Sequence, residues 1–218
     1  MLHMNIKSFF KLYKNKFFAI SFAALALIAF LSYYGIELAR SGVSYFTNQP
    51  LNIWNLVVVF IAYMVILVCN ITNDSSAYNG ILMFVFMIVA GQIFSSFDYI
   101  QAYIINMSSL NPIVITLTTF FMSLIIGEIV VGIFLYINAK RYRFGLSNDF
   151  GKLRLYGMLF AAFLTSANAF SIATTCVAVF GSATVFDLGY FFILILLPLS
   201  EIFMSISVCF TLERLRRL

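Results

Sequence analysis

The chain has 218 residues, of which 63% are hydrophobic and 10% are charged, and its formal net charge is +5. These polar residues are too few to cover the surface of a water-soluble globule. The composition therefore excludes a water-soluble globular protein and predicts an all-α, polytopic membrane protein. Because the basic residues gather beside apolar stretches, we attribute the positive charge to membrane topology and expect no nucleic acid as a partner.

Residues 1–16 combine an apolar and a basic helical face. The apolar face carries Ile6, Phe9 and Tyr13, and the basic face carries Lys7, Lys11 and Lys14. This pattern predicts an amphipathic helix on the inner leaflet, with its lysines at the membrane surface, before the chain turns into its first span. The alternative is a basic flank that only follows the positive-inside rule.

Six apolar stretches approach the length of about 20 residues that a helix needs to cross the hydrocarbon core. They predict transmembrane helices over residues 17–37, 54–72, 80–97, 112–137, 156–179 and 187–210. Residues 17–212 would thus form a six-helix transmembrane domain, followed by a basic cytoplasmic tail over residues 213–218. No stretch remains for a soluble catalytic domain.

The basic residues predict which links face the cytoplasm. Every Lys and Arg except Arg40 lies before the first span, between the fourth and fifth spans, or after the start of the basic tail. The positive-inside rule therefore predicts that both termini and the 138–155 link are cytoplasmic, in the inner or plasma membrane of the cell. The N-x-S/T sequons at Asn70 and Asn73 would then face the cytoplasm, and we interpret them as chance matches.

Four polar side chains on four predicted spans fall at similar depths. They are Gln92, Glu128, Asn168 and Glu201. Glu128 precedes Lys140 by about 12 residues, or roughly 18 Å along a helix, and Glu201 lies at a similar distance from Arg214. The sequence therefore predicts an intramembrane polar layer, with Glu128 inside the protein near Glu201. A carboxyl group in a span is by default a candidate for function, with a structural role as the alternative, whereas Asn and Gln more often tie helices together.

Small residues on the fourth and fifth spans predict where these two helices meet. The contact would use Ser123 and Gly127 on one side and Ala162, Ser166 and Ala169 on the other. Small side chains favour such contacts because they let two backbones approach closely. Pro198 predicts a kink in the sixth span, since proline cannot donate the hydrogen bond to the preceding turn.

The sequence gives little reason to expect catalysis. The one histidine, His3, lies outside the spans, which excludes a Ser-His hydrolase, a haem ligand pair and an HExxH zinc site. No glycine-rich phosphate loop occurs, and three cysteines in or beside the spans favour neither a disulfide framework nor a metal knuckle. We therefore expect no enzyme activity, cofactor or metal site, and any use of ATP would need a partner chain.

The segment "FFKLYKNKFFAISFAALALIAF", residues 9–30, is similar in character to the start of small ABC-2-type export permeases. The layout also resembles theirs: an amphipathic N-terminal helix, six spans and both termini inside. This resemblance implies a membrane-embedded translocation subunit that pairs with a separate ATPase and dimerises. The link "NITNDSSAYNG", residues 70–80, departs from the pattern, because it is short and has no basic residue where such permeases present a charged coupling segment.

Other functions fit the same pattern. Vitamin-binding subunits of energy-coupling-factor importers are similar in size and span number. A proton- or cation-conducting channel or carrier would use Glu128 and Glu201, although the internal repeats of many carriers are not evident. An assembly or scaffold subunit would use the polar layer only for packing. All of these imply the lipid bilayer as a partner, and most imply further subunits, such as an ATPase, a second membrane subunit or a second copy.

Overall fold

The computed structural model describes residues 6–42, 50–72, 78–93, 112–147, 149–181 and 188–215. Within these ranges the chain forms six helices and no strand. The helices are α1 (Ile6–Ser41), α3 (Pro50–Ile71), a helix over Tyr78–Ile93, α5 (Pro112–Arg143), α6 (Phe150–Gly181) and α7 (Leu188–Leu215). The prediction of an all-helical protein is therefore confirmed for the described part of the chain.

Four of the helices are long and apolar enough to cross a membrane. Their candidate spans are Lys14–Arg40, Ile115–Arg143, Phe150–Thr174 and Phe191–Arg214. The other two apolar segments, Leu56–Ile71 and Tyr78–Ile93, are shorter. The Tyr78–Ile93 helix is roughly 24 Å long, against about 30 Å of hydrocarbon, and residues 94–97 of the predicted third span lie outside the described residues. The chain is thus a multi-pass membrane protein, and the count of six spans stays a prediction.

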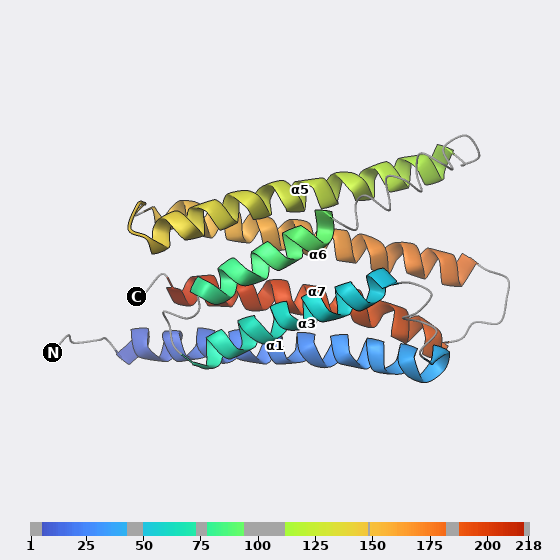
Figure 1. The fold of residues 1–218 in the computed structure, drawn as a ribbon, viewed down its shortest axis with the longest axis horizontal. Coiled ribbons are helices and arrows are strands. Elements are labelled where there is room, and N and C mark those ends of the chain that lie inside the picture. Colours follow the sequence, from blue (N-terminus) through green and yellow to red (C-terminus); the bar gives the residue numbers. More distant parts are fainter. Residues whose placement is uncertain are drawn as a thin grey trace.

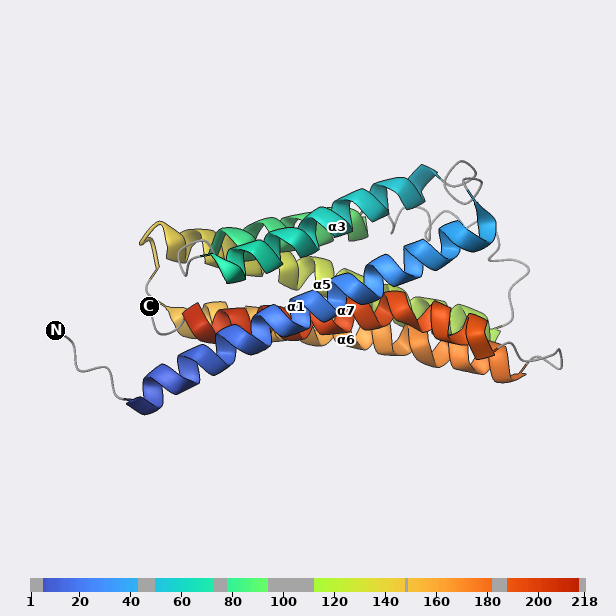
Figure 2. The ribbon, with the colours of Figure 1, turned by 90° about the horizontal axis from the view of Figure 1, so that it is seen from below.

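The helices follow one another around a packed ring. Helix α7 contacts α1 and α6, α6 contacts α5, and α1 contacts α3. The Tyr78–Ile93 helix lies between α3 and α5 and packs closely against both. Its Gly80 is so close to Cys69 of α3, and its Val89 so close to Gly132 of α5, that a Cβ added at either glycine would meet the other side chain. Figure 2 shows α3 and this green helix on one side of the molecule and α6 and α7 on the other. Large buried side chains such as Tyr63 fill the space between them.

The helices alternate in direction around this ring. The start of α1, the end of α7 and the turn between α5 and α6 all lie at one end of the molecule (Figure 1). We call this the inner end, after the predicted topology. A cytoplasmic location for both termini and the 138–155 link needs this arrangement, and the orientation itself stays a prediction.

Helix α1 does not turn between the amphipathic segment and the first span. It is one helix of 36 residues, and it continues through residues 16 and 17. The sequence between Ile6 and Tyr34 has no glycine or proline, the residues at which sharp helix bends usually occur. Lys14 is exposed, with its Nζ 5.7 Å from the centre of the Phe18 ring. The side chains of Lys7 and Lys11 lie outside the described part.

Helices α5 and α6 are neighbours, as predicted, but the predicted contact surface is wrong. Ala162, Ser166 and Ala169 are all exposed on α6. On α5, Ser123 is also exposed, and its hydroxyl donates to a carbonyl of its own helix. Only Gly127 lies at the interface. These small residues therefore form an outward strip instead of the interface itself.

Aromatic rings set against glycines form the actual α5–α6 interface. A Cβ added at Gly127 would collide with the ring of Phe163, and one added at Gly132 would meet Phe160 at 3.0 Å as well as Val89. Further along, the rings of Phe134 and Tyr156 stack with their centres 5.6 Å apart. Ring-to-glycine packing gives the close contact that the sequence analysis assigned to two small faces.

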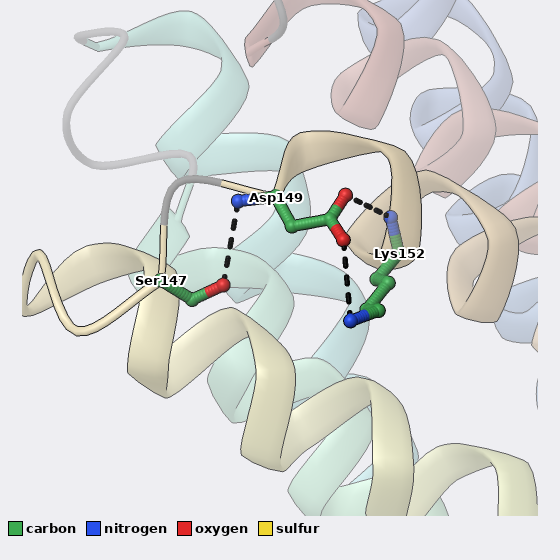
Figure 3. Close-up of polar contacts among 3 residues, drawn as sticks. All are labelled: Ser147, Asp149 and Lys152. Atoms are coloured by element: carbon green, nitrogen blue, oxygen red, sulfur yellow. Dashed lines mark hydrogen bonds and ion pairs between the residues drawn. The ribbon is translucent and has the colours of Figure 1, made fainter.

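The turn between α5 and α6 has well-formed helix caps. After α5, Gly145 has a φ of 67°, and Leu146 N–H donates to the Arg141 carbonyl at 2.9 Å, as in a Schellman motif. Before α6, Asp149 accepts a hydrogen bond from the backbone N–H of Lys152 at 3.1 Å (Figure 3). This bond and the nearby lysine hold the pKa of Asp149 below its usual value. The caps stop α5 and start α6 within a few residues, so the chain reverses direction sharply.

Helix α7 contains Pro198 and is bent along its length (Figure 1). The proline removes the hydrogen bond that its N–H would otherwise donate to the Leu194 carbonyl. Close by, the Ser200 hydroxyl donates to the Leu197 carbonyl at 2.7 Å. The bend agrees with the kink predicted from the proline.

Candidate functional site

Helix α7 carries two stripes of polar residues that face the bundle interior. Those on the face toward α1 and α3 are Ser200, Ser207, Thr211 and Arg214, and those on the face toward α6 are Glu201 and Ser205. The first set repeats at spacings of seven, four and three, and the second at a spacing of four, so each forms one stripe on a helix. Because α7 contacts three other helices, these stripes reach into the core of the molecule.

The structure brings Asn168 and Glu201 into direct contact. The Asn168 Nδ2 donates to Glu201 Oε2 at 2.7 Å and to the carbonyl of Leu164 at 2.8 Å. About one turn away, the hydroxyls of Thr165 and Ser205 lie 2.9 Å apart. Two polar pairs therefore join α6 to α7.

Glu128 projects from α5 into the bundle, and its exposed fraction is 0%. Its polar neighbours are Glu201 on α7 and Gln92 on the Tyr78–Ile93 helix. Gln92 is close enough to act on this carboxyl group as a hydrogen-bond partner, but no basic side chain in the described part of the chain forms an ion pair with it. The four side chains of the predicted polar layer thus face the bundle interior from four helices, and Glu201 is close enough to Glu128 to act on it electrostatically.

Tyr63 on α3 is a member of this site that the sequence analysis missed. It is fully buried, and its hydroxyl lies 3.3 Å from Ser200 Oγ. Glu201 is also close enough to act on it electrostatically. The available signal was a hydroxyl within an apolar run, but tyrosine is so common in this chain that this signal did not stand out.

No basic side chain neutralises the two carboxyl groups within the described residues. The ion pairs found there are Glu37–Arg40, Asp149–Lys152 and Glu213–Arg154. A charge in a low-dielectric interior is costly unless it is paired or bonded. The groups around the carboxyls offer amide and hydroxyl oxygens, which suit a proton or a hard cation better than a soft metal.

A second polar cluster lies toward the inner end and was also missed. Arg214, assigned from sequence to a cytoplasmic tail, lies within α7 and is fully buried. Its Nη1 donates to the Asn70 carbonyl at 3.1 Å and to Asn70 Oδ1 at 3.3 Å. Asn70 Nδ2 in turn donates to the Ile66 carbonyl at 2.9 Å and to Thr211 Oγ1 at 3.0 Å. A side chain so enclosed is no acceptor for a glycan, which agrees with our interpretation of that sequon.

No protein-family model, no curated protein and no solved structure matches this chain. The likeness to ABC-2-type permeases therefore remains a resemblance of layout. The function has to be argued from the interior site itself.

Proposed function

We propose that this chain is a membrane-embedded translocation subunit in which Glu128 and Glu201 form an interior site for a proton or a cation. The observation that carries the proposal is the Glu128 carboxyl group, which is fully buried near a second carboxyl group and has no basic partner among the described side chains. A group so placed is stable in the interior only when a proton or a bound cation neutralises it.

The energetics favour a functional carboxyl pair over a structural one. An unpaired buried polar group costs about 1–3 kcal/mol, and a charged one costs more. Elsewhere in this bundle, hydroxyl groups join helices without any charge: the hydroxyls of Thr165 and Ser205 lie 2.9 Å apart, and Ser207 donates to the Ala19 carbonyl at 2.7 Å. Two neighbouring carboxyls add repulsion whenever both are ionised. A proton shared by the pair, or a bound cation, removes this repulsion.

Chemical labelling tests the site without any partner subunit. Dicyclohexylcarbodiimide is an apolar reagent that reacts with protonated carboxyl groups, so we expect it to modify Glu128 or Glu201 of the full chain in detergent. Mass spectrometry of peptides would locate the adduct. Labelling should decrease as the pH rises, or when Na⁺ or K⁺ is added if a cation occupies the site. Absence of labelling at every pH from about 5 to 9, or labelling that neither pH nor cations change, would contradict the proposal.

Variants then separate a functional from a structural role. In liposomes containing a pH-sensitive dye, Glu128→Gln should abolish any cation-dependent or proton flux of the wild type while leaving the folded yield unchanged. Glu37→Gln is the matched control, because Glu37 is also buried but forms an ion pair with Arg40 on α1. If Gln at 128 is silent and Leu at 128 lowers the folded yield, the layer is structural and the chain fits a scaffold subunit instead.

The layout resemblance supports a separate ATPase as a partner in the same proposal. Purification of the tagged full chain from its native membrane should then retain a nucleotide-binding protein. If the labelling succeeds and no such protein is retained, the carboxyl site stands as that of an independent channel or carrier.

A further inference from the structure

A groove lies between α5 and the Tyr78–Ile93 helix, toward the inner end of the molecule. It has a volume of about 440 Å³. Its lining residues are Asn79, Leu82, Met83, Phe86, Tyr136 and Arg143. None of these residues belongs to the interior carboxyl site, so the groove is a separate feature of the surface.

The two helices present their groove residues in register. Asn79 and Phe86 are seven residues apart on one helix, and Tyr136 and Arg143 are seven residues apart on α5, so each pair spans two turns, or roughly 10 Å. The helices are antiparallel, and the rings of Phe86 and Tyr136 lie 6.2 Å apart. Asn79 therefore faces Arg143 at one end, and the two aromatic rings meet at the other.

The groove is thus polar and cationic at one end and apolar along the rest. Arg143 is exposed at the last residue of α5, and its guanidinium group lies 5.6 Å from the centre of the Phe144 ring. Among the described side chains, no carboxylate forms an ion pair with Arg143. The apolar part opens outward, since Met83 is 47% exposed and Phe86 is 61% exposed.

We propose that this groove binds one anionic phospholipid. The phosphate would accept hydrogen bonds from Arg143 and Asn79, and an acyl chain would lie along Leu82, Met83 and Phe86. Arginine suits this role because its planar group binds a phosphate through two parallel hydrogen bonds. Basic pockets between membrane helices at the cytoplasmic side bind anionic head groups. Helix α5 has Lys140, Arg141 and Arg143 in its last turn, at the inner end that the predicted topology assigns to that side.

A lipid explains the groove better than a soluble anion does. A free phosphate would use only the polar end and would leave the adjoining apolar surface unused. A diacyl lipid matches both parts, because its charged and apolar portions are adjacent in the same order. The proposal is independent of the carboxyl site and needs no transport activity.

The test is native mass spectrometry of the full chain in neutral detergent, titrated with phosphatidylglycerol or with phosphatidylcholine of the same acyl chains. We expect tighter binding of phosphatidylglycerol. Arg143→Ala should weaken that binding about fivefold, the effect of one basic residue near a membrane surface. Arg141→Ala is the matched control, since it removes the same charge from the same turn but does not line the groove. Equal losses in both variants would overturn the proposal in favour of a diffuse surface charge.

Two further measurements test the apolar part. Met83→Trp should fill the groove and weaken phosphatidylglycerol binding without a change of charge. Soluble glycerol 3-phosphate should fail to displace the bound lipid. If it displaces the lipid, or if Met83→Trp has no effect, the site recognises only a phosphate and the lipid proposal is wrong. Equal binding of the two lipids would refute it as well.

Discussion

Asn70 ties α3 to α7, and its replacement by alanine should destabilise the bundle. The Asn70 side chain is fully buried, donates to Thr211 and accepts from Arg214. A hydrogen bond between neutral groups contributes about 0.5–1.5 kcal/mol and one to a charged group about 1.5–3 kcal/mol, so Asn70→Ala should cost about 2–4.5 kcal/mol. The bond from Arg214 to the Asn70 carbonyl survives the substitution, which keeps the cost within this range.

Asn138→Ala is the matched control for this variant. Asn138 is also helical and also donates to the carbonyl four residues earlier, at 2.7 Å, but it makes no contact with another helix in the described hydrogen bonds. Alanine raises helix propensity by up to about 0.7 kcal/mol in both variants, so this gain cancels between them. The free energy of unfolding in detergent, followed by tryptophan fluorescence, should differ by roughly 2–4.5 kcal/mol between the two variants. Equal stabilities would show that Arg214 does not depend on the Asn70 side chain, and would refute the reasoning.

Three further predictions concern backbone space, a helix cap and topology. Gly132→Ala should lower stability by up to about 2 kcal/mol, because the added methyl group would overlap side chains of two neighbouring helices. Gly35→Ala is the control: its methyl group has open space, so it should raise stability by up to about 1 kcal/mol. Similar melting temperatures for the two variants would contradict this assignment of the space around each glycine. Asp149→Asn keeps an N-cap oxygen but loses the charge. Because the pKa of Asp149 is lowered in the folded protein, the charge should stabilise the fold above the usual Asp pKa, and this stabilisation should be lost as the pH falls through the folded pKa. The wild type and Asp149→Asn should therefore melt at more similar temperatures in acid than at neutral pH, and a constant difference would argue against the cap. A cysteine that replaces Lys152 should resist an external thiol reagent in intact cells, while one that replaces Thr47 should react. The opposite labelling pattern would show that the orientation in the membrane is the reverse of the predicted one.

The amino-acid sequence by itself determined the class of this protein and the depth of its polar groups. Apolar runs of this length can be stable only as membrane helices, because helices satisfy their backbone hydrogen bonds internally. The rise per residue is fixed, so counting from the basic flanks put Asn168 and Glu201 at one level. The structure places their polar atoms 2.7 Å apart. Distance along a helix axis is thus a local property that the sequence carries.

Rotation about each helix axis was decided only by the tertiary structure. Lipid is as apolar as the protein core, so apolar residues cover both the outward and the inward sides of α5 and α6, and no hydrophobic face marks the interior. The strip of Ala162 and Ser166 was therefore taken for a contact surface, although a rotation of about 100° per residue sets it apart from the buried strip with Asn168. Arg214 likewise looked like a surface charge because the partner that encloses it, Asn70, comes from a helix distant in the sequence. Which face turns inward depends on how several helices fill a shared volume, and that is a property of the assembled bundle.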